Sequence, residues 1–566
     1  MLDIRQRQHA IGLLVLMLLG MALEMIGIGL VLPVLGLMTS PDLFERISGL
    51  QLLTAWFGYP DQKELLYWGM IALALIYGLK NGYLAVLAWA QSSFVFRLHA
   101  NLSHRLFVHY LRQSYTFHLQ HNSAQLIRNI VVEVNLFTNA LQAFMVLSTE
   151  LLVIVGVGVL LVFVEPLATL IVMGTLGFSA LLFYLLFRNR LSHWGKERQY
   201  YDGKRIQLVQ EALGSVKEIR LLGRESDFSD QYSHCNKINA RVLQHQHFLQ
   251  QLPRLWLEVL AITGLVVVVL TLIAQGRSPA DFLPTIGLFG AAAFRLMPSI
   301  NRCLTSIQST RFALSAVNTL YQELVEVAAE RNAQLTEKRK VHVVEKFNDR
   351  IDLSAVSFQY PGSEDLVLFN IRLSIPRGAM IGFIGESGAG KSTLVDIILG
   401  LLTPSSGAVL VDGEDIRKNL RAWQNQIGYV SQTIYLTDDT LRRNVAFGLA
   451  DDDIDENAVW NALRAAQLEN FVRQLPEGLN TKVGERGVRL SGGQRQRIGI
   501  ARALYHDPSI LVLDEATSAL DTDTESGVME AVQAMHGEKT VLIITHRLST
   551  IQHCDQVIRV DNGTIV

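Results

Sequence analysis

The chain has 566 residues, 49% of them hydrophobic, and a formal net charge of −2 at pH 7. Its mean hydropathy of +0.25 is high for a soluble protein. A near-neutral chain lacks the strongly basic character of most nucleic-acid-binding proteins, so we expect no nucleic acid partner. The three cysteines are scattered without metal-ligand spacing, which argues against a disulfide framework.

Hydrophobicity is concentrated in the first half of the chain. About 20 apolar residues cross a bilayer, and six segments approach or exceed that length. They are residues 11–38, 67–90, 141–164, 167–187, 255–274 and 283–304. From about Val341 the chain instead has the pattern of a soluble α/β domain. We therefore predict a transmembrane domain at 1–325, a linker at 326–345 and a soluble domain at 346–566.

Basic residues indicate the orientation of the six segments. They gather after the second and fourth segments, between 97 and 128 and between 188 and 224, whereas the loop after the third is essentially "VEPL". Basic loops stay on the cytoplasmic side of a membrane. We predict a multi-pass protein of the bacterial inner membrane, with both termini and the soluble domain in the cytoplasm.

The soluble half begins with a phosphate-binding pattern, "GESGAGKST", which lies between a strand-like and a helix-like run. Glycines let backbone N–H groups close around phosphate oxygens at a helix N-terminus. We expect Lys391 to neutralise the β- and γ-phosphates of ATP and Ser392 to bind Mg²⁺. The nucleotide-binding residues predicted from this motif are Gly385, Glu386, Ser387, Gly388, Ala389, Gly390, Lys391, Ser392 and Thr393.

Two further segments complete the expected ATP site. The apolar run "ILVLDEATSALD" carries Asp514, which would hold Mg²⁺, and Glu515, which would polarise the attacking water. A plain strand with an acidic helix cap is the alternative, and the preceding phosphate loop argues against it. The segment "LSGGQRQR" offers a serine hydroxyl and glycine amides for a γ-phosphate. Its predicted contact residues are Ser491, Gly492, Gly493 and Gln494.

From residue 358 to the end, the chain resembles the ATP-binding-cassette family. The resemblance implies that Tyr360 in "FQYPG" stacks on adenine and that His546 in "IITHR" contacts the γ-phosphate. It also implies that Gln432 in "YVSQ" binds Mg²⁺ and couples nucleotide to the membrane helices. The segments "VGERG" (483–487) and "SALD" (518–521) resemble an exporter-specific loop and a loop at the dimer seam.

In this family the signature segment faces away from its own phosphate loop, so two domains sandwich each ATP. One such domain per chain implies a dimer. Lys391, Ser491, Glu515 and His546 are all present, which favours a homodimer with two working ATPase sites. We predict an ATPase with ATP and Mg²⁺ as cofactors, in which hydrolysis is coupled to transport.

Six spans ahead of one cassette resemble the type IV exporter half-transporters. The predicted fold is an all-α six-helix membrane domain fused to an α/β P-loop ATPase domain. The resemblance also implies helices that extend into the cytoplasm, and two short helices near 114–126 and 214–222. Plain loops are the alternative for these two segments.

Basic residues occur in or beside the apolar segments, where a charge costs roughly 2.5–3.5 kcal/mol. They are Lys80, Arg254, Arg295 and Arg302. Arg295 and Arg302 are seven residues apart, so they share one helix face about 10 Å apart. These groups either pair with acids such as Glu24 and Glu258, or line a cavity that receives a phosphate or pyrophosphate.

An amphipathic helix is expected at about 42–57, between the first two spans and on the outer surface. Together with "AAFRLMPSINR", it resembles the PglK-type flippases. That resemblance implies flipping of a polyprenyl-pyrophosphate oligosaccharide for protein glycosylation. A general lipid or multidrug exporter is the alternative, and a channel of the same fold is another. The chain ends in an apparent closing strand, from which we expect a short missing tail.

Overall fold

The computed structural model describes residues 4–30, 62–164, 166–274, 279–336, 347–516 and 522–566. The chain divides into two compact units. The first comprises Met1–Gln113 and His121–Lys338, and the second comprises Ser114–Gln120 and Arg339–Val566. The external helix expected at 42–57 lies outside the described residues.

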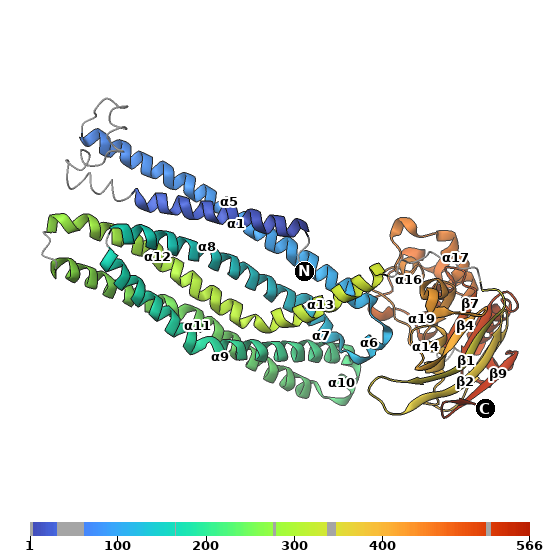
Figure 1. Ribbon diagram of the computed structural model, residues 1–566. Helices are drawn as coiled ribbons and strands as arrows, with labels where there is room; N and C mark the ends of the chain where they lie inside the picture. The colour runs from blue at the N-terminus through green and yellow to red at the C-terminus, as the bar shows by residue number, and fades with distance from the viewer. Residues whose placement is uncertain (1–3, 31–61, 165, 275–278, 337–346, 517–521) are drawn as a thin grey trace. The chain divides into compact units, whose positions relative to one another are not determined.

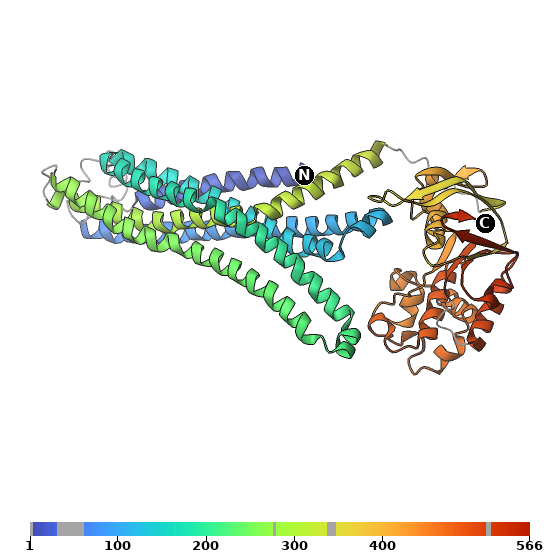
Figure 2. The ribbon, with the colours of Figure 1, turned by 90° about the horizontal axis from the view of Figure 1, so that it is seen from below.

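Long helices form the first unit (Figures 1 and 2). Those that carry the predicted spans are α1 (Ile4–Gly29), α5 (Gln62–Arg112), α8 (Val134–Val164), α9 (Pro166–Gly214), α11 (Glu225–Ala274) and α12 (Pro279–Phe312). At 1.5 Å per residue, the 49 residues of α9 extend about 74 Å, more than twice the ~30 Å of a bilayer core. Such helices continue well beyond the membrane, as predicted.

In the described part of the chain, three helical segments are long and apolar enough to cross a membrane. They are Arg7–Gly29, Tyr67–Arg112 and Ser123–Phe163. The other three expected spans fall within α9, α11 and α12 and stay predictions. Many large apolar side chains of these helices are exposed, including Leu18, Leu75 and Phe178, as expected for helices in lipid.

Short helices occupy the two segments, near 114–126 and 214–222, that were expected to form cytoplasmic helices. They are α6 (Tyr115–Gln120), α7 (Ser123–Arg128) and α10 (Val216–Leu222), so the prediction of helices there is confirmed. Asn122 caps α7 by accepting from the Ala124 amide, and α10 stops at Gly223, whose φ is +62°. α6 belongs to the same compact unit as the ATPase domain.

The linker expected at 326–345 begins as helix. α13 (Leu314–Thr336) continues through "VEVAAERNAQLT", a run of good helix formers with neither Gly nor Pro to stop it. The apolar pattern fades there, which is why the sequence suggests a linker. The remainder of the expected linker lies outside the described residues.

A buried ion network joins α7 and the π-helical turn η1 (Asn129–Glu133) to α9. The Glu133 side chain is fully buried and accepts from Arg198 at 3.0 Å, with Arg128 at 3.5 Å. Arg198 also pairs with Asp202 at 3.0 Å. Because an uncompensated buried ion costs several kcal/mol, this network holds η1 and α9 in one register.

The second unit contains two sheets. The antiparallel sheet has the order β2 (Leu366–Pro376), β1 (Arg350–Gln359), β4 (Ser406–Val411) and β5 (Glu414–Asp415). The second sheet has the order β10 (Thr564–Ile565), β9 (Gln556–Asp561), β3 (Met380–Ile384), β8 (Thr540–Ile544), β7 (Ile510–Asp514) and β6 (Ile427–Val430). Five strands of this sheet, β9, β3, β8, β7 and β6, are parallel to one another, so their carboxyl ends meet at one edge.

Helices and two hydrophobic cores enclose the parallel sheet. These helices are α14 (Lys391–Ile398), α15 (Leu420–Gln424), α16 (Leu441–Val445), α17 (Glu456–Ala465), α18 (Glu469–Gln474), α19 (Gly492–Leu504), α20 (Thr522–Gln533) and α21 (Leu548–Ile551). All five residues of β8 are buried, as in strands covered on both faces. The predicted α/β architecture is confirmed, and its strand ends position the site described next.

Gly195 provides a test of the packing between α9 and α12. A Cβ atom there would clash with the backbone carbonyl of Phe312, which cannot move aside as a side chain could. We expect Gly195→Ala to destabilise the helical unit by about 1–3 kcal/mol, measured as a lower midpoint of thermal unfolding in detergent. Gly174→Ala, in the same helix with nothing nearby, is the matched control and should leave the midpoint unchanged or slightly raised. Equal midpoints for the two variants would contradict this packing.

Candidate functional site

The loop between β3 and α14 has the backbone of a phosphate cradle. Gly385, Gly388 and Gly390 have φ values of +147°, +83° and +102°, a region that L-residues with side chains rarely adopt. A Cβ atom on Gly385 would also clash with the Val560 carbonyl, and one on Gly390 would lie 2.8 Å from Leu368. Glycine is therefore required at these positions, and the helix N-terminus follows at once.

Lys391 lies in the first turn of α14 and is nearly buried. Its ammonium group donates to the carbonyl oxygens of Gly385 at 2.8 Å and Glu386 at 2.7 Å. Carbonyl oxygens are weaker partners for an ammonium group than phosphate oxygens are. The lysine can therefore exchange these partners for the β- and γ-phosphates of a nucleotide. The next residue, Ser392, is exposed.

Glu515 is the centre of a second group of predicted residues. Gln432 donates to one of its carboxylate oxygens at 2.7 Å, and His546 Nε2 lies 3.4 Å from the other. The three residues follow the parallel strands β7, β6 and β8, whose carboxyl ends share an edge. This arrangement can hold a carboxylate in place to orient and polarise a water molecule.

Negative charge is crowded beside this group. Burial, and then the charge of Glu515, raises the pKa of Asp514. Burial and the charge of Asp514 raise the pKa of Asp396 to about 6. A divalent cation would relieve this repulsion. The oxygen donors predicted for it, on Ser392, Gln432 and Asp514, are of the type that hard cations prefer.

The signature segment forms the N-terminus of α19. Ser491 Oγ accepts from the Gln494 amide at 3.2 Å, and the Gln494 side chain accepts from the Ser491 amide at 2.9 Å. Gly492 and Gly493 follow in the first turn, so their amides point out of the helix end. In the described residues, these side-chain bonds of Ser491 and Gln494 stay within the cap and do not reach the phosphate loop. The helix end can thus receive an anion from elsewhere.

The predictions for three other motifs have different outcomes. Tyr360 donates to, or accepts from, Thr393 at 3.1 Å, which places it beside α14, and its stacking on adenine stays a prediction. In "VGERG", Gly487 has a φ of +67°, and a Cβ there would lie 2.7 Å from Leu436. The segment 518–521 lies outside the described residues.

Three of the four basic residues predicted to contact the substrate have carboxylate partners. Lys80 donates to Glu24 at 3.2 Å, and both side chains are almost fully buried. Arg254 pairs at 3.2 Å with Glu258, one helical turn away on an exposed face. For both residues the structure shows the carboxylate partner that was the stated alternative, and a role in substrate binding stays a prediction.

Arg302 is half-exposed, and its Nε donates to Glu150 Oε1 at 2.6 Å. Its two terminal nitrogen atoms have no partner among the described residues. The side chain of Arg295 lies outside the described residues, although its backbone belongs to α12. Binding of a substrate by Arg295 and Arg302 stays a prediction as well.

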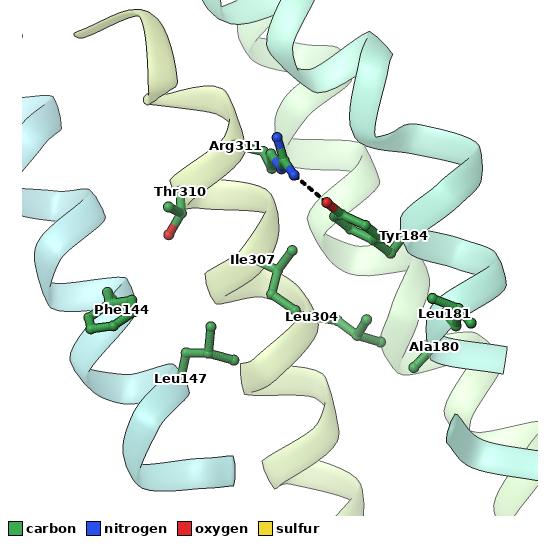
Figure 3. A pocket seen from close by; sticks show the side chains of 9 residues that line it. All are labelled: Phe144, Leu147, Ala180, Leu181, Tyr184, Leu304, Ile307, Thr310 and Arg311. Carbon is green, nitrogen blue, oxygen red and sulfur yellow. Dashed lines mark hydrogen bonds between the residues drawn. The ribbon is translucent and has the colours of Figure 1, made fainter. Parts of the chain in front are cut away.

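Arg311 lies beyond the expected end of the last span and was not among the predicted site residues. It lines a cavity of about 510 Å³ between α8, α9 and α12, together with Tyr184, to whose hydroxyl it donates a hydrogen bond (Figure 3). The remaining lining is apolar apart from Thr310: Phe144, Leu147, Ala180, Leu181, Leu304 and Ile307. The i, i+3, i+7 spacing of Leu304, Ile307 and Arg311 is the signal that could have revealed this face.

Comparisons with known proteins agree with this architecture. Residues 13–292 match the family of the ABC transporter transmembrane region, and residues 368–518 match the ABC transporter family. An ATP-dependent lipid A-core flippase of Cupriavidus pinatubonensis is 33% identical over 459 residues, covering 79% of this chain and 75% of the relative. The chain belongs to the ABC transporter family. Its membrane-embedded helical domain and ATP-binding ATPase domain are therefore established.

Two further proteins are similar to this ABC transporter. An ATP-dependent lipid A-core flippase of Nitrosococcus oceani is 30% identical over 83% of this chain and 78% of its own. The solved structure of a bacterial Atm1-family ABC exporter with ATP bound has a TM-score of 0.78 and 21% identity, and covers 99% of this chain and 94% of its own. This likeness confirms the predicted exporter fold.

Glu515 can be tested by a substitution that keeps its shape and removes its charge. We expect Glu515→Gln to bind ATP normally but to hydrolyse it about 10²–10⁴-fold more slowly, because the positioned carboxylate that polarises water is lost. ATPase turnover and equilibrium ATP binding measure the two effects separately. Glu538→Gln, an exposed glutamate elsewhere in the domain, is the matched control. ATPase turnover of Glu515→Gln near that of the unmodified protein would show that Glu515 does not polarise the attacking water.

Lys80 can be tested for a packing role. Lys80→Met leaves Glu24 buried without its ammonium partner, and we expect a loss of about 3–5 kcal/mol in stability. Lys80→Met combined with Glu24→Leu should recover most of this loss. Arg254→Ala is the control, since its exposed pair is worth about 0–1 kcal/mol. The measurement is the thermal unfolding midpoint, and a double variant no more stable than Lys80→Met would exclude the pairing as the cause.

Proposed function

We propose that this ABC transporter flips a lipid-linked, pyrophosphate-bearing oligosaccharide across the bacterial inner membrane, driven by ATP hydrolysis in the cytoplasm. The observation that carries the proposal is the cavity between α8, α9 and α12. It combines an apolar wall with the guanidinium group of Arg311. Such a lining suits a molecule with a hydrocarbon part and an anionic part.

Arginine is the appropriate residue for the anionic part. A guanidinium group offers several donors in a fixed plane that match phosphate oxygens. Arg311 has no carboxylate partner among the described residues, and Arg302 uses only Nε for Glu150. The two residues lie nine apart on α12, about 14 Å along the axis and on opposite sides of the helix, so a head group in the cavity would meet Arg311, whereas Arg302 lies outside the cavity lining.

The ATP site supports a transporter that works as a homodimer. Ser491 and the amides of α19 form an anion-binding helix end that completes an ATP site only if it meets the phosphate loop of another copy. Mg²⁺ bound by Ser392, Gln432 and Asp514 would screen the charge of the β- and γ-phosphates when present. Lys391 would neutralise the phosphates, and Glu515 would orient the water. Both similar flippases carry lipid A-core in their names, which supports a lipid cargo.

The rival is a general lipid or multidrug exporter of the same fold, and the charge of the cargo separates the two. The test uses the full-length protein in nanodiscs, with ATPase activity measured against polyprenyl-pyrophosphate glycan, neutral polyprenol and a neutral hydrophobic drug. We expect stimulation by the pyrophosphate glycan only. In the Arg302→Ala/Arg311→Ala variant, the glycan concentration for half-stimulation should rise about 10–100-fold, since the loss of one charge-assisted hydrogen bond costs about 1.5–3 kcal/mol.

The matched control is Arg241→Ala, which changes an exposed arginine of α11 and should respond to the glycan as the unmodified protein does. If neutral drugs stimulate and the double variant responds normally, the exporter is of the multidrug type. If lipid A stimulates but the pyrophosphate glycan does not, the cargo is a different lipid. Passive current without vectorial uptake into inverted vesicles would indicate a channel.

A further inference from the structure

A group of metal-ligating side chains lies apart from both the ATP site and the cavity. His109 of α5 and Glu323 and Glu326 of α13 place their ligand atoms within 4.8 Å of one another. The reason is local packing. Leu106 and Leu320 are buried in the core that joins the two helices. His109 and Glu323 each lie three residues further along, on the same face as these leucines.

Surrounding side chains hold two of these groups in place. Asn129 donates to Glu323 Oε1 at 3.2 Å and to the Tyr110 hydroxyl at 3.1 Å. Gln113 lies 3.0 Å from His109 Nε2 and orients the ring. His109 and Asn129 are about 95% buried. Ligands of protein-bound metals are typically fixed by such a second layer of hydrogen bonds.

The local electrostatics favour a cation. Glu323 and Glu326 place carboxylate oxygens within 4.8 Å of each other, and Glu323 is partly buried. Two carboxylates close together in a half-buried place repel each other. A bound divalent ion would neutralise both of them.

We propose that His109, Glu323 and Glu326 bind a divalent transition metal, of which Zn²⁺ fits best, with water as a fourth ligand. One imidazole and two carboxylates provide three protein ligands, the number found in open zinc sites. Mg²⁺ prefers oxygen ligands alone and so fits this site poorly. The metal links α5 to α13. Since α13 directly precedes the segment that leads to the ATPase domain, the site is suited to restrain that helix.

The experiment uses the full-length protein in nanodiscs, free of tags and nucleotide, in buffer with millimolar Mg²⁺. Competition with a fluorescent Zn²⁺ chelator measures affinity and stoichiometry. We expect one Zn²⁺ per chain and at least tenfold weaker binding for His109→Ala and for Glu326→Gln. Asn129→Ala, which leaves the three ligands in place and removes the bond that positions Glu323, should weaken binding about 10–100-fold. The controls His553→Ala and Glu538→Gln alter exposed groups elsewhere and should bind as the unmodified protein does.

Glu326 is exposed, so Glu326→Gln should fold normally even if His109→Ala does not. The thermal unfolding midpoint without metal checks this. Added Zn²⁺ should raise the midpoint of the unmodified protein, because a ligand of the folded state stabilises it, and should leave that of Glu326→Gln unchanged. The proposal is overturned if the unmodified protein binds no Zn²⁺ in the competition, or if Glu326→Gln binds it as tightly. Neither outcome depends on the identity of the cargo.

Discussion

A charge that leaves water must keep a partner, and this constraint shapes both halves of the transporter. In the helical unit the partners are carboxylates built into the fold, such as Glu24 for Lys80 and Glu133 for Arg198. In the ATPase domain, Lys391 rests instead on two carbonyl oxygens of its own loop. Carboxylate pairs are expensive to break, whereas carbonyl contacts yield readily to a phosphate. The phosphate loop therefore gives Lys391 exchangeable partners, whereas Lys80 and Arg198 have carboxylate partners that are costly to remove.

Much of the ATP site could be predicted from sequence because each motif is short and follows a strand. Gln432, Glu515 and His546 are far apart in the chain, yet a parallel sheet brings the ends of β6, β7 and β8 to one edge. The motifs do not reveal how the side chains meet. That both Gln432 and His546 approach the carboxylate of Glu515 depends on its backbone, which has a φ of +48°.

The helical unit was less predictable for a physical reason. Apolar runs reveal where helices lie, and local spacing suggested the pair of Arg254 and Glu258, which is confirmed. Partners on different helices leave no such trace: Arg302 and Glu150 are 152 positions apart. Arg311 was missed because the apolar run ends before it. The first part of the expected linker proved to be helix because helix propensity persists after hydrophobicity fades.

The pairing of Arg302 bears on how a cargo could be selected. Glu150 occupies only Nε, so the terminal nitrogens keep donors that a phosphate could use without displacing the carboxylate. A neutral cargo would gain little there. An anion would meet attraction from the guanidinium and repulsion from Glu150, and at similar distances the two nearly cancel whatever the charge of the anion. A pyrophosphate offers several acceptor atoms to the terminal nitrogens of Arg302. We infer that selection at Arg302 depends on the hydrogen-bond acceptors of the head group more than on its net charge, because attraction and repulsion scale together with that charge.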